Sequence, residues 1–200
     1  TGETVKHLTT PKAPAGLLND LVFTADAAYV TDTFRPTLWR VSRSGADIGT
    51  LEPWLKLDPA ITYAEGPNIN GIVATPDGKT LLLVQMNKGL LWKVDVATKA
   101  ITQVDLKGAV LGRADGLVLD GNRLYAVLQE TTEVVAVDLP PDFASGTVVG
   151  HLKDDRFVAP ATAFKTADKL YVVVTQFSKR EDNTATKPFN VFEMPLSAIK

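Results

Sequence analysis

Short apolar runs separated by turn signals recur along the whole chain. The runs are about five to seven residues long and rich in Val, Leu, Tyr and Thr, which is typical of β-strands. Dipeptides that favour tight turns, such as Asp77-Gly78 and Asp120-Gly121, break the runs. A helical repeat would need longer segments with a period of about 3.6 residues. The pattern therefore predicts an all-β protein.

These strands form a repeat of three successive types. A first strand opens on polar or small residues, a second is continuously apolar, and a third alternates. First strands are predicted at 19–23, 70–74, 115–119 and 161–165, so their starts lie 51, 45 and 46 residues apart. Second strands are predicted at 28–31, 80–84, 124–127 and 170–174, and third strands at 38–41, 90–95, 134–138 and 189–193. The period predicts a β-propeller of four-stranded antiparallel blades that start near residues 19, 70, 115 and 161.

The repeat accounts for about four blades of a ring that we expect to contain six. We interpret residues 1–200 as one partial propeller domain, in which residues 1–10 form the outer strand of a preceding blade. Blades pack through apolar faces, so an open array would expose the faces of its terminal blades. We therefore expect an additional segment to complete the propeller. Trp39 and Trp92 are expected to pack between blades rather than to stack on a ligand.

Composition narrows the possible partners. The 200 residues are 45% hydrophobic and 22% charged, with a formal net charge of -2, which is the balance of a folded domain without a field that attracts nucleic acid. Nucleic acid is therefore not expected as a partner. A membrane is not expected either, because no apolar run is long enough to cross a bilayer. A chain that begins at Thr1 and lacks cysteine is compatible with an exported protein, which we prefer, and with a truncated cytoplasmic one.

Side-chain chemistry restricts the kind of metal that the chain could hold. There are no cysteines and only two histidines, so a zinc or copper cage is excluded. A metal here would be a hard cation such as calcium or magnesium, bound through carboxylate and amide oxygens. The sequence also lacks the glycine-rich motifs of nucleotide sites and the nucleophile elbow of serine hydrolases.

Blade topology predicts where such oxygens would gather. In a blade of antiparallel strands, the start of the first strand and the loop between the second and third strands lie on the same face of the disc. Asn19, Asn70 and Asp115 therefore surround one mouth of the central channel. The four loops expected to form a rim around that mouth, suited to a small polar molecule, are 33–36, 85–88, 129–132 and 176–180.

The strand openings resemble those of a known family. Asn19-Asp20, Asn70-Gly71 and Asp115-Gly116, with the stretches 18–32, 70–84 and 115–127 around them, are similar to blade openings of the gluconolactonase, senescence marker protein and luciferin-regenerating family of six-bladed propellers. The resemblance implies a lactone hydrolase with one divalent cation, usually calcium, at the centre of one face.

The resemblance also implies roles for single residues. Asn70 and Asp115 fall on metal-ligand positions, and Asn19 falls on a position that contacts metal-bound water or substrate. Asp115 would also be the base that accepts a proton from an attacking water. The first-blade glutamate of the family has no counterpart here; Glu65-Gly66-Pro67 echoes its motif but lies at the wrong point of the repeat. An upstream segment supplies that ligand, or the site is degenerate.

Alternatives remain for these residues and for the function. Asn and Asp at strand starts also form turns with their own backbone, which need no metal. Asp20 is expected to form such a turn or a bond to a neighbouring blade. Arg113 and Arg35 are candidates for binding a substrate hydroxyl or carboxylate, or are solvated loop charges. The predicted function is metal-dependent hydrolysis of a lactone or small cyclic ester. The alternative is a non-catalytic propeller that binds a protein or small ligand through the same rim.

Overall fold

Four antiparallel β-sheets form the computed structural model, which describes residues 2–12 and 14–200. We call the sheets blades 1 to 4. Blade 1 contains β1 (Leu18–Phe23), β2 (Ala27–Asp32), β3 (Thr37–Ser44) and β4 (Asp47–Lys56), and blade 2 contains β5 (Ile69–Ala74), β6 (Thr80–Gln85), β7 (Leu90–Asp95) and β8 (Ile101–Gln103). Blade 3 contains β9 (Ala114–Asp120), β10 (Arg123–Leu128), β11 (Glu133–Asp138) and β12 (Thr147–Lys153). Blade 4 contains β13 (Pro160–Lys165), β14 (Lys169–Val174) and β15 (Asn190–Pro195), and the 3-10 helices are η1 (Phe177–Lys179) and η2 (Leu196–Ala198).

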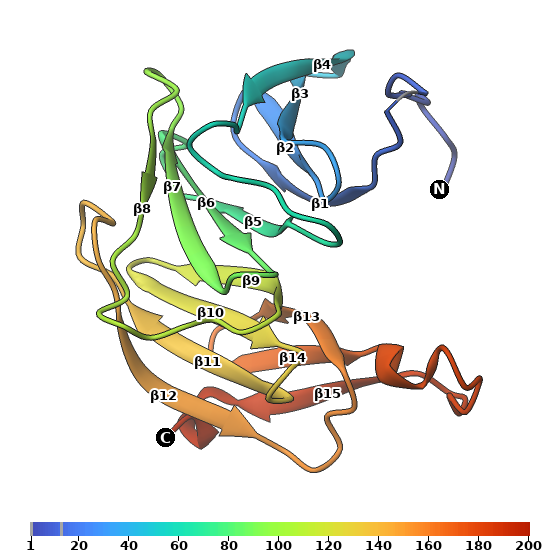
Figure 1. The fold of residues 1–200 in the computed structure, drawn as a ribbon, viewed down its shortest axis with the longest axis vertical. Coiled ribbons are helices and arrows are strands. Elements are labelled where there is room, and N and C mark those ends of the chain that lie inside the picture. The colour runs from blue at the N-terminus through green and yellow to red at the C-terminus, as the bar shows by residue number, and fades with distance from the viewer. Residues whose placement is uncertain (1, 13) are drawn as a thin grey trace.

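The strands of each blade pair in chain order, as a meander. The blades follow one another as a propeller, from blade 1 in blue to blade 4 in orange and red (Figure 1). The first strands line the inside, because β1 packs against β5, β5 against β9, and β9 against β13. This arrangement confirms the predicted fold class, and the strands of all three types lie within one or two residues of their predicted ends, apart from the longer end of β3. The number of blades in a closed ring stays a prediction.

A separate apolar core fills each of the three boundaries between blades. Tyr29 and Leu38 of blade 1 meet Leu83 of blade 2 in the first core, and equivalent clusters join blades 2 and 3 and blades 3 and 4. Trp39 and Trp92 are both buried, and each indole N–H donates to the last residue of the second strand of its own blade, Asp32 or Gln85, at 3.2 Å. Trp92 lies in the core between blades 1 and 2, as expected, and Trp39 is buried in blade 1.

Each first strand carries a β-bulge at its start. The pairing register shifts between Leu18 and Leu21, between Ile69 and Ile72, and on β13 between Pro160 and Thr162; in blade 3 the shift covers the two residues that follow Ala114. Bulges interrupt the hydrogen-bond ladder and redirect side chains. The polar openings of the repeat are therefore bulges within strands rather than isolated turns.

The segment before blade 1 forms no strand in residues 2–12. The ammonium group of Lys6 donates to the carbonyls of Ile48 and Gly49, at 2.6 and 2.8 Å, and so lies near the outer strand β4. Thr1, the first residue of the outer strand expected over 1–10, lies outside the described residues. A strand without a neighbouring blade has no partner for its backbone, so that assignment stays a prediction. Within the described chain, no helix is long and apolar enough to span a membrane.

Candidate functional site

Side chains of blade 1 bind the bulge that opens β5. The hydroxyl of Thr31 donates to the carbonyl of Asn70 at 2.8 Å, and the Asp20 carboxylate accepts the N–H of Ile72 at 3.2 Å. A second hydroxyl, of Thr33, donates to the carbonyl of Ile69 at 2.9 Å. Backbone groups inside a protein need partners when a ladder is interrupted. Blade 1 therefore holds the strand opening on which Asn70 lies.

The glycines after Asn70 and Asp115 permit close contact between blades. A Cβ atom at Gly71 would collide with the carbonyl oxygen of Asp115, and one at Gly116 would lie 2.7 Å from the Cα of Thr162. Neither glycine has a positive φ angle. The Asn-Gly and Asp-Gly pairs are thus present because adjacent first strands approach too closely for a side chain, and not because a turn requires them.

Asn70 and Asp115 are brought together at the start of β5 and β9. Burial raises the pKa of Asp115 to about 6; the Gln129 amide opposes this by hydrogen bonding, the charge of Asp20 adds to it, and the Asn70 amide lowers it again. The side chain of Asn70 is buried, and its Nδ2 lies 3.3 Å from the sulfur of Met86. Its Oδ1 has no hydrogen-bond partner within residues 2–12 and 14–200. The pair therefore offers a proton-accepting carboxylate beside an unpaired amide oxygen.

The three predicted metal-site residues, Asn19, Asn70 and Asp115, each contact the predicted rim loop of their own blade. Asn19 donates to Thr33 at 2.8 Å, Asn70 contacts Met86, and Gln129 donates to Asp115. Asn19 also lines a groove on the face of blade 1 that points away from blade 2. Its neighbour Asp20 lines the groove along the inner strands.

Asp20 forms both of the contacts expected from its place in the sequence, a turn with its own backbone at Leu21 and a bond to the neighbouring blade at Ile72. Burial raises its pKa, while the backbone N–H groups of Ile72 and Leu21 lower it. Because its charge acts on Asp115, two carboxylates lie near each other at this mouth. Its partner Ile72 is 52 residues away along the chain, so the sequence pattern does not identify which residue of the neighbouring blade Asp20 contacts.

The two arginines lie in different environments. Arg113 is exposed, has a φ angle of 49°, and lowers the pKa of Asp115 through its charge, so it lies close to the paired side chains. Arg35 is buried and forms an ion pair with Asp32, which is completely buried. Its guanidinium also lies 4.9 Å from the ring centre of Trp39. These contacts of Arg35 stabilise blade 1, and a substrate role for either arginine stays a prediction.

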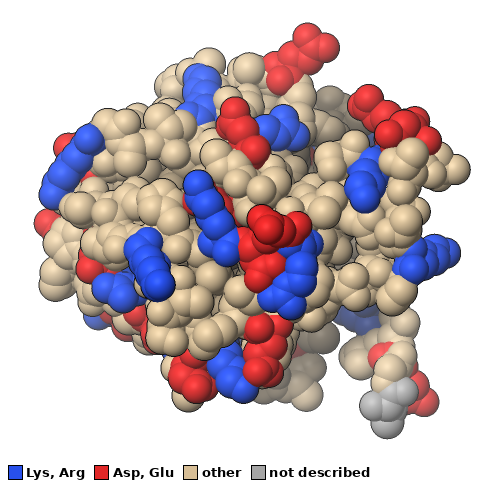
Figure 2. Space-filling view, turned by 90° about the horizontal axis from the view of Figure 1, so that it is seen from below, with Lys and Arg blue, Asp and Glu red and all other residues tan. Residues whose placement is uncertain are grey.

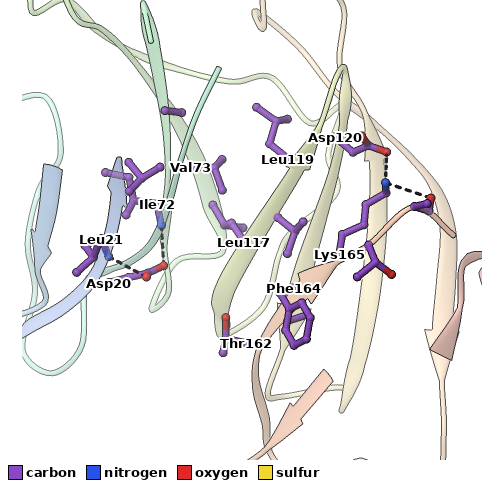
Figure 3. A pocket seen from close by; sticks show the side chains of 16 residues that line it. Asp20, Leu21, Ile72, Val73, Leu117, Leu119, Asp120, Thr162, Phe164 and Lys165 are labelled. Carbon is purple, nitrogen blue, oxygen red and sulfur yellow. Dashed lines mark hydrogen bonds and ion pairs between the residues drawn. The ribbon is translucent and has the colours of Figure 1, made fainter. Parts of the chain in front are cut away.

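A groove of about 690 Å³ runs along the inner strands of all four blades. Figure 3 shows Asp20 on one wall, bonded to the backbone of Leu21 and Ile72, with Leu117 and Leu119 further along. Lys165 forms an ion pair with Asp120 at 2.9 Å on the far side. Because all first strands run in the same direction, this ion pair marks the end of the channel opposite Asp115.

The donor set fits a hard cation only in part. Asn70 and Asp115 supply one amide oxygen and one carboxylate, both suited to calcium. No group of three His, Cys, Asp or Glu side chains that could hold a metal occurs in the described part of the chain. Glu65 is exposed in the loop before β5. Over the face shown in Figure 2, basic and acidic side chains are interspersed.

Comparison by sequence finds no relative: no family model and no curated protein matches. Solved structures do match. The periplasmic gluconolactonase PpgL of Pseudomonas aeruginosa is 17% identical, with a TM-score of 0.54 over 71% of this chain and 41% of that one. A putative 6-phosphogluconolactonase of Bacteroides fragilis is 14% identical, with a TM-score of 0.58 over 94% and 58%. This chain shares the β-propeller fold of these lactonases.

A protein named for a different reaction also matches this chain by structure. Hydrazine synthase of Kuenenia stuttgartiensis is 10% identical, with a TM-score of 0.61 over 98% of this chain and 50% of that one. At such identities the likeness concerns the fold alone, and a propeller scaffold supports many functions. The chain spans about half the length of these three proteins.

Proposed function

We propose that this chain forms a large part of a hydrolase that acts on a lactone or small cyclic ester at the channel mouth beside Asp115. The observation that carries the proposal is that the Asp115 carboxylate lies beside Asn70, whose buried Oδ1 has no hydrogen-bond partner in the described residues. Polar groups inside proteins are normally paired, so such an atom at a channel mouth suggests a ligand. The lactonases among the structural neighbours support the same reaction class.

Asp115 acts as the general base in this proposal. It accepts a proton from a water molecule whose oxygen attacks the carbonyl carbon of the ring. The ring carbon–oxygen bond then breaks, the alkoxide takes the proton back from Asp115, and a hydroxy acid leaves. A base with a pKa near the working pH both accepts a proton and returns it efficiently. The raised pKa of Asp115, about 6, agrees with that requirement.

The neighbouring groups position Asp115 and the substrate. Gln129 fixes one carboxylate oxygen by donating to it, and the exposed guanidinium of Arg113 is available for a substrate oxygen. A divalent cation, most suitably calcium, would be held by Asn70 and Asp115, with Asn19 as the further candidate. Such a cation would polarise the carbonyl as a Lewis acid. Charge neutralisation by a cation would also relieve the repulsion between Asp115 and Asp20.

The test compares Asp115→Asn with Asp120→Asn in the complete protein. Both residues lie on β9, but Asp120 is at the opposite end of the channel. With a sugar δ-lactone as substrate, Asp115→Asn should reduce kcat at least about 100-fold, whereas Asp120→Asn should keep most activity. Equal activity of the two variants would contradict the role of Asp115.

The alternative is a non-catalytic propeller that binds a ligand at the same rim. It is favoured because the described residues contain no group of three His, Cys, Asp or Glu side chains that could hold a metal. Calorimetry distinguishes the two. If no lactone is hydrolysed but Asp115→Asn still weakens binding of the lactone, the rim is a binding site without catalysis.

A further inference from the structure

The outer face of blade 1 is an apolar surface without a covering element in residues 2–12 and 14–200. It contains a groove of about 430 Å³, lined chiefly by side chains of β1 to β4. Leu21 is 49% exposed and Phe23 is 59% exposed. Leu8 of the N-terminal segment also lines the groove, but it leaves these two side chains largely uncovered. Exposed apolar patches of this kind usually mark interaction surfaces.

The position of this face within the repeat indicates what covers it. The fourth residue of the first strand is Ile72 in blade 2, Leu117 in blade 3 and Ala163 in blade 4, and each is buried in the core shared with the preceding blade. In blade 1 the same position is Leu21. Blade 1 thus presents the surface with which every other blade contacts its predecessor.

The second strands show the same pattern, on a different set of residues. Their fourth residues are Leu83, Ala126 and Val172 in blades 2 to 4, all buried against the preceding blade. The equivalent residue of blade 1 is Val30, which lines the uncovered groove. Two adjacent strands therefore present blade-facing residues with no blade in contact.

We propose that the face of blade 1 formed by Leu21, Phe23, Val30 and Ile48 docks a further antiparallel β-blade of the same propeller. The existing boundaries define its chemistry. On the side that faces the next blade, the third residue of the second strand is Tyr29, Leu82 or Tyr125 in blades 1 to 3, and all three are buried. The docking blade presents a large apolar or aromatic side chain at this position.

A second copy of the chain fits the groove less well. Within the described residues, the one uncovered face of the type that meets a following blade is that of blade 4, where Tyr171 occupies the equivalent position and stacks on Phe164 at 4.6 Å. The Tyr171 hydroxyl donates to Glu193, which also binds Lys169 at 2.6 Å. Docking this face would bury charged groups against an apolar groove, at a desolvation cost. The solved structures that match are longer than the part they share with this chain, which covers 41%, 50% and 58% of them.

The experiment introduces one thiol on the face. The 200 residues contain no cysteine, so Phe23→Cys is a unique reactive site within them, and Val110→Cys, at a 61% exposed position, is the matched control. Both variants are made in the natural gene, so that any adjoining chain is present, with cysteines elsewhere replaced by serine. The rate of maleimide labelling is measured over a wide range of protein concentration.

We expect Phe23→Cys to react at least about tenfold more slowly than Val110→Cys at every concentration, because a docked blade must open before the thiol reacts. Equal rates would overturn the proposal, since the face would be open. Protection that disappears on dilution, together with the molar mass of a dimer, would also overturn it, because a second copy would be the occupant. Ile48→Cys, on the same face, repeats the measurement if Phe23→Cys does not fold.

Discussion

A methyl group added at Gly71 should force blades 2 and 3 apart. Its carbon would collide with the carbonyl oxygen of Asp115 and lie 3.0 Å from Cγ and 3.1 Å from the backbone nitrogen of Leu117. Two of these three atoms belong to the backbone of β9, so no rotamer change removes the collision. Overpacking a core costs roughly 1–3 kcal/mol, and a backbone obstacle places Gly71→Ala near the upper end, at about 3 kcal/mol. For a protein of this size, that corresponds to a decrease in Tm of roughly 6–12 °C.

Urea denaturation and calorimetry measure this loss, and Gly49→Ala is the control. A Cβ atom at Gly49 would meet the hydroxyl of Ser42, which can rotate away, and would lie 3.2 Å from the Ser42 carbonyl oxygen. We expect the control to lose less than about 1 kcal/mol. If Gly71→Ala is no less stable than the control, the close contact between β5 and β9 is not a constraint on the sequence, and the reasoning about the Asn-Gly and Asp-Gly pairs fails.

Two further predictions concern buried charges. The pKa of Asp115 is raised from 3.8 to about 6, so the folded state binds the proton more tightly, and this group makes the protein more stable as pH falls from about 6 to about 4. In EDTA, the stability gain of Asp115→Asn over wild type should therefore grow from pH 4 to pH 6 and then level off; a gain that is constant with pH would contradict the raised pKa. Asp32→Ala should cost about 3–5 kcal/mol, because it leaves the buried Arg35 without its partner. Asp26→Ala, which removes an exposed pair with Arg40, should cost at most about 1 kcal/mol in the same denaturation assay.

Local patterns explain why the strands could be predicted. The second strands are continuous apolar runs, and pairs such as Asp77-Gly78 provide tight turns; Gly78 and Gly121 indeed have φ angles of 69° and 59°. These signals depend on residues adjacent in sequence. Both the blade starts and the contacts of Asn70 and Asp115 with their rim loops follow from the same repeat, since each loop belongs to the same blade as its strand opening.

Other features of the site depend on residues far apart in the chain. The position of Asp20 predicts a turn or a bond to a neighbouring blade, but it does not identify the partner Ile72, which lies 52 residues away. The role of Gly71 depends on Asp115 in the neighbouring blade, and the Arg35 guanidinium donates to the carbonyl of Pro11, 24 residues away, at 3.1 Å. The spacing of residues in the sequence predicts which strand each residue belongs to. It does not predict which atoms of two neighbouring strands lie closest together.

The bonds from blade 1 to the opening of β5 have a consequence for how the protein unfolds. Thr31, Thr33 and Asp20 supply partners to the backbone around Asn70, so that backbone keeps its shape only while blade 1 is folded. Partial opening that begins at blade 1 would remove these partners and release the Asn70 side chain before blade 2 itself unfolds. Hydrogen exchange at the amide of Ile72 should therefore follow the exchange of β1 and β2 rather than that of β6 and β7, so the cooperative unit that contains Asn70 extends across the boundary between the two blades.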